Sequence, residues 1–189
     1  APSAKAEKSK ISEYFSFNNC EKLMLEFTNA CGSEINTLRR MVVSEVPVMA
    51  IEEVEFINND SAMFDEVIAN RLGLIPLTTD LSTYNEKENC KCSDKGCPLC
   101  QVEFSLEAKG PCTVYSSQLI SKDEKVKPFF GEMPIVKLLE GQELKFNAIA
   151  ILGRGKEHMK YAPGVAFYHH KPKFIINTDA AKLNQFRDQ

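Results

Sequence analysis

The sequence predicts an α+β fold in which much of the sheet is antiparallel. Two segments in the first half of the chain carry apolar residues at the spacing of an amphipathic helix. Several shorter runs alternate apolar and polar residues, and polar or Gly- and Pro-bearing turns separate them. With 189 residues, 43% of them hydrophobic and 26% charged, the chain can bury a core in one or two domains.

The first expected elements are a strand and a helix. Residues 22–27 alternate apolar and polar side chains, as in a half-buried strand. Ser33 is a good N-cap for the helix, because its hydroxyl can accept from the free N–H groups of the first turn. Apolar residues recur behind it at helical spacing, at Ile35, Leu38 and Val42. Pro47 disfavours helical geometry at the residue before it, so the helix should end near Glu45.

A second strand and a second helix follow. Residues 48–57 have an extended pattern with glutamates between apolar positions. Ser61 is expected to cap the second helix and Gly73 to end it. The apolar face of that helix would consist of Phe64, Val67, Ile68 and Leu72. Residues 74–77 are long enough only for a short strand or an apolar plug.

The rest of the chain reads mostly as strands. Residues 102–108 alternate most clearly, with apolar residues at every even position. Further expected strands, each bounded by turn residues, are 113–116, 135–139, 144–151, 165–170 and 173–177, and a short helix should begin within 179–187.

Composition narrows the class of protein. A formal net charge of −3 argues against a protein that covers nucleic acid with its whole surface, since such binders carry a basic face. No apolar run approaches the roughly 18 residues of a membrane span. Residues 1–11 are small, polar and charged, and we interpret them as a flexible leader. Seven cysteines with one tight cluster fit a reducing, intracellular compartment better than a disulfide framework.

Four cysteines with the spacing C-x-C-x4-C-x2-C indicate a metal site, and they are Cys90, Cys92, Cys97 and Cys100. Four thiolates on one short loop can complete a tetrahedral shell around zinc, which is the arrangement of a structural site. The loop is almost devoid of apolar residues, so metal ligation would supply the free energy that orders it. An iron–sulfur cluster and four metal-free surface thiols are the alternatives.

Three motifs resemble one protein family. They are residues 36–56, residues 65–77 and residues 153–163. In this order they are similar to the archaeal D subunit of RNA polymerase and its eukaryotic counterparts, and more distantly to the bacterial alpha subunit. The cysteine loop lies between the second and third motifs, where archaeal and eukaryotic members commonly place a zinc loop. The resemblance extends over residues 23–174, which is most of the chain.

The resemblance implies a fold and a function. A discontinuous dimerisation domain would be formed by residues 12–46 and 153–189, with residues 47–152 as an inserted domain that carries the zinc loop at 90–100. The first helix would pack against a small L-type subunit, and this heterodimer would nucleate assembly of the two large catalytic subunits. Polymerase chemistry and its magnesium would belong to the large subunits, and this chain would be non-catalytic. The location would be cytoplasmic, or nuclear in a eukaryote, with DNA reached only through the assembled complex.

The resemblance also suggests which residues contact partners. The expected contacts are Ile35, Leu38, Arg39, Arg40, Val42, Glu66, Arg71, Lys156, Glu157 and His158. Each also has a plainer interpretation. The apolar helix positions fit an ordinary core stripe, and the arginine pair fits a solvated surface. Glu66 and Arg71 fit a local polar pair. The Lys-Glu-His run fits a loop that pairs its charges with one another or with a neighbouring subunit better than it fits a general acid–base site.

Two features of the family have no counterpart in this sequence. Many archaeal members carry a ferredoxin-like insertion with extra cysteines, whereas the last cysteine here is Cys112. The sequence ends at Gln189, soon after the position where the family's long C-terminal helix would begin. Two other functions are alternatives to the assembly subunit. A zinc or thiol enzyme would need an open metal position or a redox pair before a helix, and a nucleic-acid module would need a basic stripe.

Overall fold

The computed structural model describes residues 10–14, 24–90, 92 and 96–172, so the strand and helix expected within 173–187 lie outside the described residues. A short hairpin opens the fold, in which β1 (Lys10–Tyr14) pairs antiparallel with β2 (Met24–Thr28). The expected strand at 22–27 is therefore confirmed within its described part. Because β1 begins at Lys10, the expected leader overlaps its first two residues.

The centre of the fold is a four-stranded antiparallel sheet. Its strands are β3 (Pro47–Asn59), β8 (Glu143–Arg154), β4 (Gln101–Lys109) and β6 (Ile120–Ser121), in that spatial order. A smaller antiparallel pair is formed by β5 (Cys112–Tyr115) and β7 (Pro134–Leu138). The predicted α+β class with antiparallel sheets is confirmed. Residues 74–77 contribute one isolated bridge, between Leu77 and Pro128.

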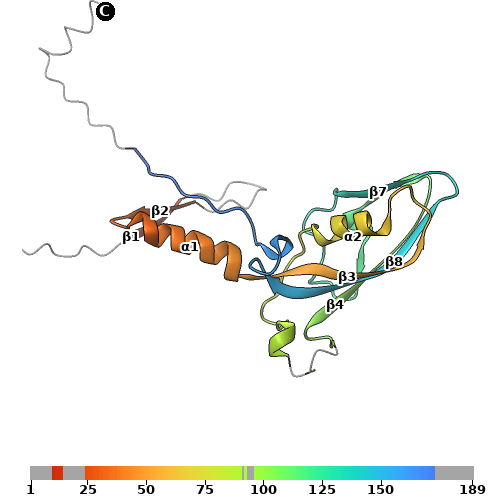
Figure 1. The fold of residues 1–189 in the computed structure, drawn as a ribbon, viewed down its shortest axis with the longest axis horizontal. Helices are drawn as coiled ribbons and strands as arrows, with labels where there is room; N and C mark the ends of the chain where they lie inside the picture. Colours follow the sequence, from red (N-terminus) through yellow and green to blue (C-terminus); the bar gives the residue numbers. More distant parts are fainter. Residues whose placement is uncertain (1–9, 15–23, 91, 93–95, 173–189) are drawn as a thin grey trace, which may run out of the picture.

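One predicted strand is wrong. Residues 165–170 contain no strand among the described residues. Val165 and Phe167 are 91% and 71% exposed, so their alternation does not mark a face packed on this chain. After β8 the chain instead forms a one-turn 3-10 helix, η3 (Met159–Tyr161), and then runs back toward the hairpin, where Lys171 Nζ lies 3.2 Å from Glu26 Oε1. Figure 1 shows this return path beside α1.

The core lies on one face of the large sheet. Along β4 the even positions are buried and the odd positions exposed, as the alternation predicted. The even positions of β4 lie opposite apolar residues of β8. The ring centroids of Phe146 on β8 and Phe56 on β3 are 5.7 Å apart. A bulge in β3 at Glu52 restores the inward direction of the apolar residues that follow it. The sheet therefore builds a continuous core from its own strands.

The helix α2 (Asp65–Gly73) closes this core against β3 and β7. Ile68 and Leu72 are fully buried, but Phe64 is 79% exposed and Val67 is also exposed, so only half of the expected apolar face packs inward. The N-cap is Phe64, and the Ser61 cap was wrong. Ser61 Oγ donates to Asn59 Oδ1 at 2.6 Å and therefore stabilises the preceding turn. The helix ends at Gly73 as expected. Two further 3-10 turns are η1 (Lys87–Asn89) and η2 (Ser116–Gln118).

The helix α1 (Gly32–Glu45) projects from one end of the sheet (Figure 1). Its N-cap is Cys31, two residues before the expected Ser33. The carboxylate of Glu34 accepts from the backbone N–H of Cys31 at 3.0 Å, which satisfies one free donor at the helix start. The helix ends at Glu45 as the proline rule predicted. It contains no buried residue.

Candidate metal centre and interface helix

The four cysteines of the predicted metal loop come together. Their Sγ atoms all lie within 4.8 Å of one another. Cys90 and Cys97 are separated by 3.4 Å between sulfurs, and Cys100 lies 3.7 Å from both Cys92 and Cys97. The cysteines that the structure describes are all free thiols. This is a donor set that could hold one metal ion.

The spacing of the sulfurs tests which metal group fits. A tetrahedral ion with metal–sulfur bonds of about 2.3 Å places its sulfurs about 3.8 Å apart. Three of the six sulfur–sulfur pairs are separated by 3.4 or 3.7 Å, close to that edge length, and all six lie within 4.8 Å. A multi-iron cluster binds its thiolates to different irons and needs a wider opening. The residues present therefore fit a single ion with a complete set of four protein ligands.

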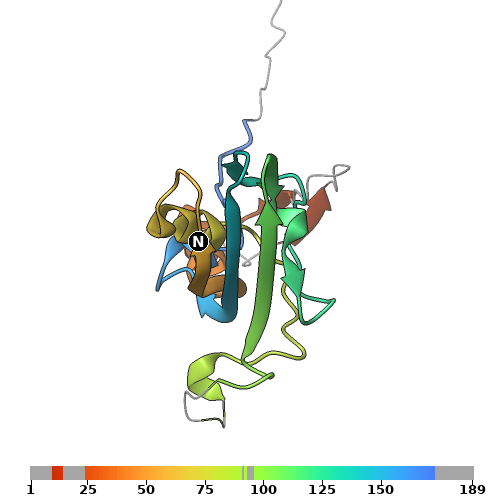
Figure 2. The same ribbon diagram turned by 90° about the vertical axis from the view of Figure 1, so that its right-hand side faces the viewer.

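The fold positions this loop at one end of the sheet. Cys90 directly follows η1, and Cys100 directly precedes β4, so both ends of the loop are anchored. The backbone N–H of Asn85 donates to the carbonyl of Leu99 at 2.9 Å and closes the base of the loop. Figure 2 shows this segment projecting beyond the end of β4.

The local environment shifts the pKa values of the thiols in opposite directions. The backbone N–H of Leu99 lowers the pKa of Cys97 to about 7, because a hydrogen bond to sulfur favours the thiolate. Burial raises the pKa of Cys100 to about 12. A cation at the centre of the cluster would stabilise all four thiolates and offset this burial cost.

The predicted interface residues of α1 form an exposed surface. Leu38 and Val42 are 41% and 39% exposed, and Ile35 is half-buried. Met41, which the sequence did not single out, is 54% exposed on the same side of the helix. The interpretation of these positions as a stripe packed in this chain's core is wrong, because no described element covers them. Within the described residues, part of the apolar face of α1 is therefore exposed.

The two arginines of α1 differ. Arg39 is half-buried and its Nε donates to Asn36 Oδ1 at 3.1 Å, one turn earlier on the same helix. Arg40 is exposed. Neither forms an ion pair with a carboxylate among the described residues. The pair thus lies beside the apolar face with its charge directed to solvent.

One charge of the Lys-Glu-His loop forms an ion pair, and its partner lies on α1 and not within the loop. Lys156 Nζ lies 3.7 Å from Glu45 Oε2, and its backbone N–H donates to the carbonyl of Ser44. Glu157 Oε2 accepts from the backbone N–H of Arg154, and His158 Nδ1 accepts from that of Lys160. The contacts of Lys156 join the loop to the end of α1, whereas those of Glu157 and His158 are local.

A second clamp holds the same loop to the sheet. Glu52, at the bulge of β3, accepts hydrogen bonds from Lys160 Nζ and from Tyr161 Oη, the latter at 2.7 Å. Partial burial opposes the charge of this carboxylate, but the two hydrogen bonds outweigh it and lower the pKa of Glu52. A Cβ at Gly153 would lie 2.6 Å from the Tyr161 ring, so only glycine fits beneath it.

Glu66 and Arg71 do not pair with each other within the described residues. Arg71 Nη1 instead donates to the carbonyl of Ile135 at 2.8 Å and joins α2 to β7. Glu66 is exposed on the first turn of the helix. The structure thus assigns Arg71 a packing contact and leaves Glu66 at the surface.

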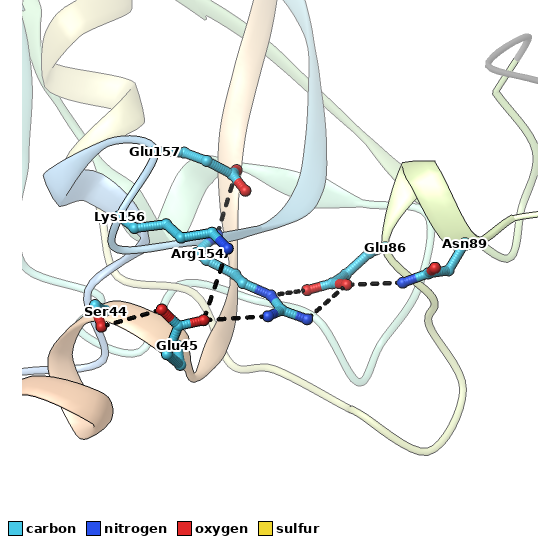
Figure 3. A network of polar contacts seen from close by, with 7 residues as sticks. All are labelled: Ser44, Glu45, Glu86, Asn89, Arg154, Lys156 and Glu157. Carbon is cyan, nitrogen blue, oxygen red and sulfur yellow. Dashed lines mark hydrogen bonds and ion pairs between the residues drawn. The ribbon is translucent and has the colours of Figure 1, made fainter. Parts of the chain in front are cut away.

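Sequence reasoning missed a polar residue that joins three separate segments of the chain. Arg154, the last residue of β8, bonds Glu86 through Nε at 2.5 Å and Nη2 at 3.0 Å, and Glu45 through Nη1 at 3.3 Å (Figure 3). It lies within the third motif, but no local pattern marks its partners, which are 68 and 109 residues away in sequence. The available signal was its position between two glycines, which implies a close approach of backbone segments.

Comparison with known proteins decides the family. A family model of the RNA polymerase Rpb3/RpoA insert domain matches residues 49–170. The chain belongs to the RNA polymerase Rpb3/RpoA family. DNA-directed RNA polymerase subunit Rpo3 of Thermococcus kodakarensis is 46% identical over 153 residues, covering 81% of this chain and 57% of the relative. The Rpo3 subunit of Pyrococcus furiosus is 51% identical over 135 residues, covering 71% and 49%.

A third Rpo3 relative, from Archaeoglobus fulgidus, is 40% identical over 157 residues, covering 82% of this chain and 60% of its own. The chain thus spans about half to three-fifths of the length of these Rpb3/RpoA-family relatives. The matched family region contains both the large sheet and the cysteine loop. The resemblance stated from the three motifs is confirmed at the level of the family. No described helix is long and apolar enough to cross a membrane.

Proposed function

We propose that this chain is a non-catalytic assembly platform of a multisubunit DNA-dependent RNA polymerase. In this role it heterodimerises with a small L-type subunit through α1, and the pair docks the two large catalytic subunits. DNA is reached only through the assembled complex. The location is the cytoplasm, or the nucleus if the source is eukaryotic. The observation that carries the proposal is α1 itself, a 14-residue helix with no buried residue in a family of polymerase subunits.

The domain arrangement follows from where the chain enters and leaves the sheet. Pro47 at the start of β3 pairs with Arg154 at the end of β8, so the chain enters and leaves the sheet at adjacent positions. This supports an inserted domain over 47–152 and a discontinuous dimerisation domain over 12–46 and 153–189. The L-type partner would cover Leu38, Val42 and the exposed arginine of the same helix. Lys156, Glu157 and His158 would lie at the edge of that interface, and Glu66 and Arg71 would face a large subunit.

The metal of the cysteine loop is proposed to be structural zinc. Four thiolates whose sulfurs lie within 4.8 Å of one another would provide every ligand and leave no position for a water or substrate. The same geometry supports zinc over an iron–sulfur cluster and an assembly role over a zinc enzyme. Zinc would stabilise a loop that has little apolar surface of its own.

The test is co-expression of the full chain with the small L-type subunit, followed by size-exclusion chromatography and elemental analysis of the peak. The expected product is a one-to-one heterodimer with one zinc. Leu38→Glu combined with Val42→Glu should abolish the heterodimer and leave the zinc content unchanged. Ile57→Glu is the matched control, because Ile57 is 56% exposed on β3 at the other end of the sheet. If the control variant alone lost the partner, or if the wild-type chain eluted separately, the proposal would fail.

A further inference from the structure

One guanidinium joins three separate segments of the chain. Arg154 ends β8, Glu45 ends α1, and Glu86 directly precedes η1, which leads into the cysteine loop. Figure 3 shows the arginine between the two carboxylates, with Glu86 on the side of the metal loop and Glu45 on the side of the helix. The bonds to Glu86 are bidentate, which is the geometry that holds a carboxylate most firmly.

The loop side of this junction extends to the first metal ligand. Asn89 Nδ2 donates to Glu86 Oε2 at 2.9 Å, and the backbone N–H of Cys90 donates to the carbonyl of Lys87. The turn between Glu86 and Cys90 is thus tied at both ends. Ordering Cys90 in a metal shell therefore orders the carboxylate that holds Arg154.

The helix side is equally close. A Cβ at Gly155 would lie 2.0 Å from the carbonyl oxygen of Val43, so the chain after Arg154 passes directly against the last turn of α1. The backbone N–H of Lys156 donates to the carbonyl of Ser44, and its Nζ adds a second cation near Glu45. The last turn of the helix therefore contacts residues 154–156 through ion pairs, a backbone hydrogen bond and a close backbone approach.

This junction matters for the orientation of α1 relative to the sheet, because the helix has few other contacts with the described residues. No residue of the helix is buried, so packing contributes little to its direction relative to the sheet. The guanidinium and the Glu86 carboxylate are 33% and 19% exposed, which shields their interaction from solvent more than a surface pair. The polar junction, the backbone contacts of Gly155 and Lys156, and the peptide link to β3 all restrain α1 within the described residues.

We propose that Arg154 couples the metal loop to α1, so that binding of the metal fixes the direction in which α1 presents its apolar face. The metal loop then affects how α1 binds the L-type subunit without itself contacting that subunit. Coupling of this kind is reciprocal, so covering α1 with its partner must raise the affinity of the loop for the metal by the same factor. The second half of this inference rests on the proposed heterodimer, whereas the first half concerns the chain alone.

The first experiment uses the full chain without a partner. Backbone amide resonances are recorded by NMR with zinc bound and after removal of zinc by a chelator. In the wild type the amides of Glu45 and Lys156 should shift, although both are remote from the cysteines in sequence. Glu86→Gln keeps the shape of the side chain and removes its charge, and it should abolish these two shifts. Lys145→Met, which breaks an exposed pair with Glu107 elsewhere on the sheet, is the matched control and should leave them unchanged.

The second experiment measures zinc affinity by chelator competition, for the chain alone and for its complex with the L-type subunit. The complex of the wild type should bind zinc roughly fivefold more tightly or better than the free chain. In Glu86→Gln and in Glu45→Gln this ratio should fall to one, and the double variant should show no further loss, because the two bonds act in series.

The outcomes separate the two claims. If the Glu45 and Lys156 amides shift equally in the wild type and in Glu86→Gln, or do not shift in either, the coupling through Arg154 is wrong. If those shifts follow the expectation but no complex forms with the L-type subunit, the heterodimer proposal fails and the coupling within the chain stands.

Discussion

The sheet and α1 use similar amphipathic patterns with opposite results. Along β4 the alternating apolar residues are buried in a core cluster that their own chain completes. Along α1 the apolar residues recur just as regularly, and none is buried. The difference lies in whether the same chain supplies a cover. An amphipathic pattern indicates a face that must be covered, and only the fold reveals which molecule covers it.

The largest effect should follow from a change in the core of the sheet. Phe146 is completely buried, so Phe146→Ala should lower the free energy of unfolding by about 3–5 kcal/mol through lost burial and the cavity left behind. Chemical denaturation of the chain, followed by circular dichroism, measures this. Leu38→Ala on α1 serves as the comparison and should change the unfolding free energy by less than about 0.5 kcal/mol. Equal losses in the two variants would remove the distinction between the two regions.

Removal of the metal should affect a third region and spare the core. At a free zinc concentration about 100 times the dissociation constant, binding stabilises the folded loop by about 2.7 kcal/mol. Chelation should therefore release residues 86–100 to proteolysis while the sheet stays folded. Cys97→Ser should reproduce this result, and Cys112→Ser on β5, outside the cluster, should not. Cooperative unfolding of the sheet on chelation would contradict the independence of its core.

Changes on the face of α1 should act on association alone. We expect Leu38→Ala combined with Met41→Ala to weaken binding of the L-type subunit by roughly tenfold or more, because exposed apolar anchors dominate such interfaces. Isothermal titration with the purified partner measures the dissociation constant. Ile57→Ala, on an exposed position of the sheet, should leave it unchanged. A partner affinity that responds to Ile57 and ignores α1 would move the interface to the sheet.

The smallest effect should be a pH dependence of the junction between the two regions. The hydrogen bond from Arg154 lowers the pKa of Glu86, so this carboxylate contributes stability above its unfolded value of about 4.3 and loses it as the pH falls through the lower folded pKa. The Arg154 Nε–H resonance should therefore be constant from neutral pH to about pH 5 and broaden in more acidic solution. In Glu86→Gln it should no longer follow this titration.

Local sequence patterns predicted most elements because their causes are local. The alternation in β4, the end of α1 before Pro47 and the clustering of four cysteines each depend on neighbours in the chain. The errors also have local reasons. Cys31 caps α1 because the Glu34 carboxylate reaches its N–H, and Ser61 is engaged by Asn59 before α2 begins.

The polar contacts around Arg154 and Glu52 were less predictable because they join residues far apart in the sequence. No periodicity could place Glu86 and Glu45 around Arg154, or Glu52 beneath Lys160 and Tyr161. Those contacts depend on the pairing of β3 with β8, which places the start of β3, just after α1, beside the end of β8. The exposure of the α1 face likewise depends on the absence of a covering element among the described residues, which a helical pattern alone cannot reveal.

Amide hydrogen exchange on α1, in the chain alone and in its complex with the L-type subunit, tests the central claim most directly. The amides of β4 and β8 should exchange slowly in both states, because their core is complete. The amides of α1 should exchange rapidly in the free chain and become strongly protected in the complex. If α1 were already as protected as the sheet in the free chain, or stayed unprotected in the complex, α1 would not be the partner surface.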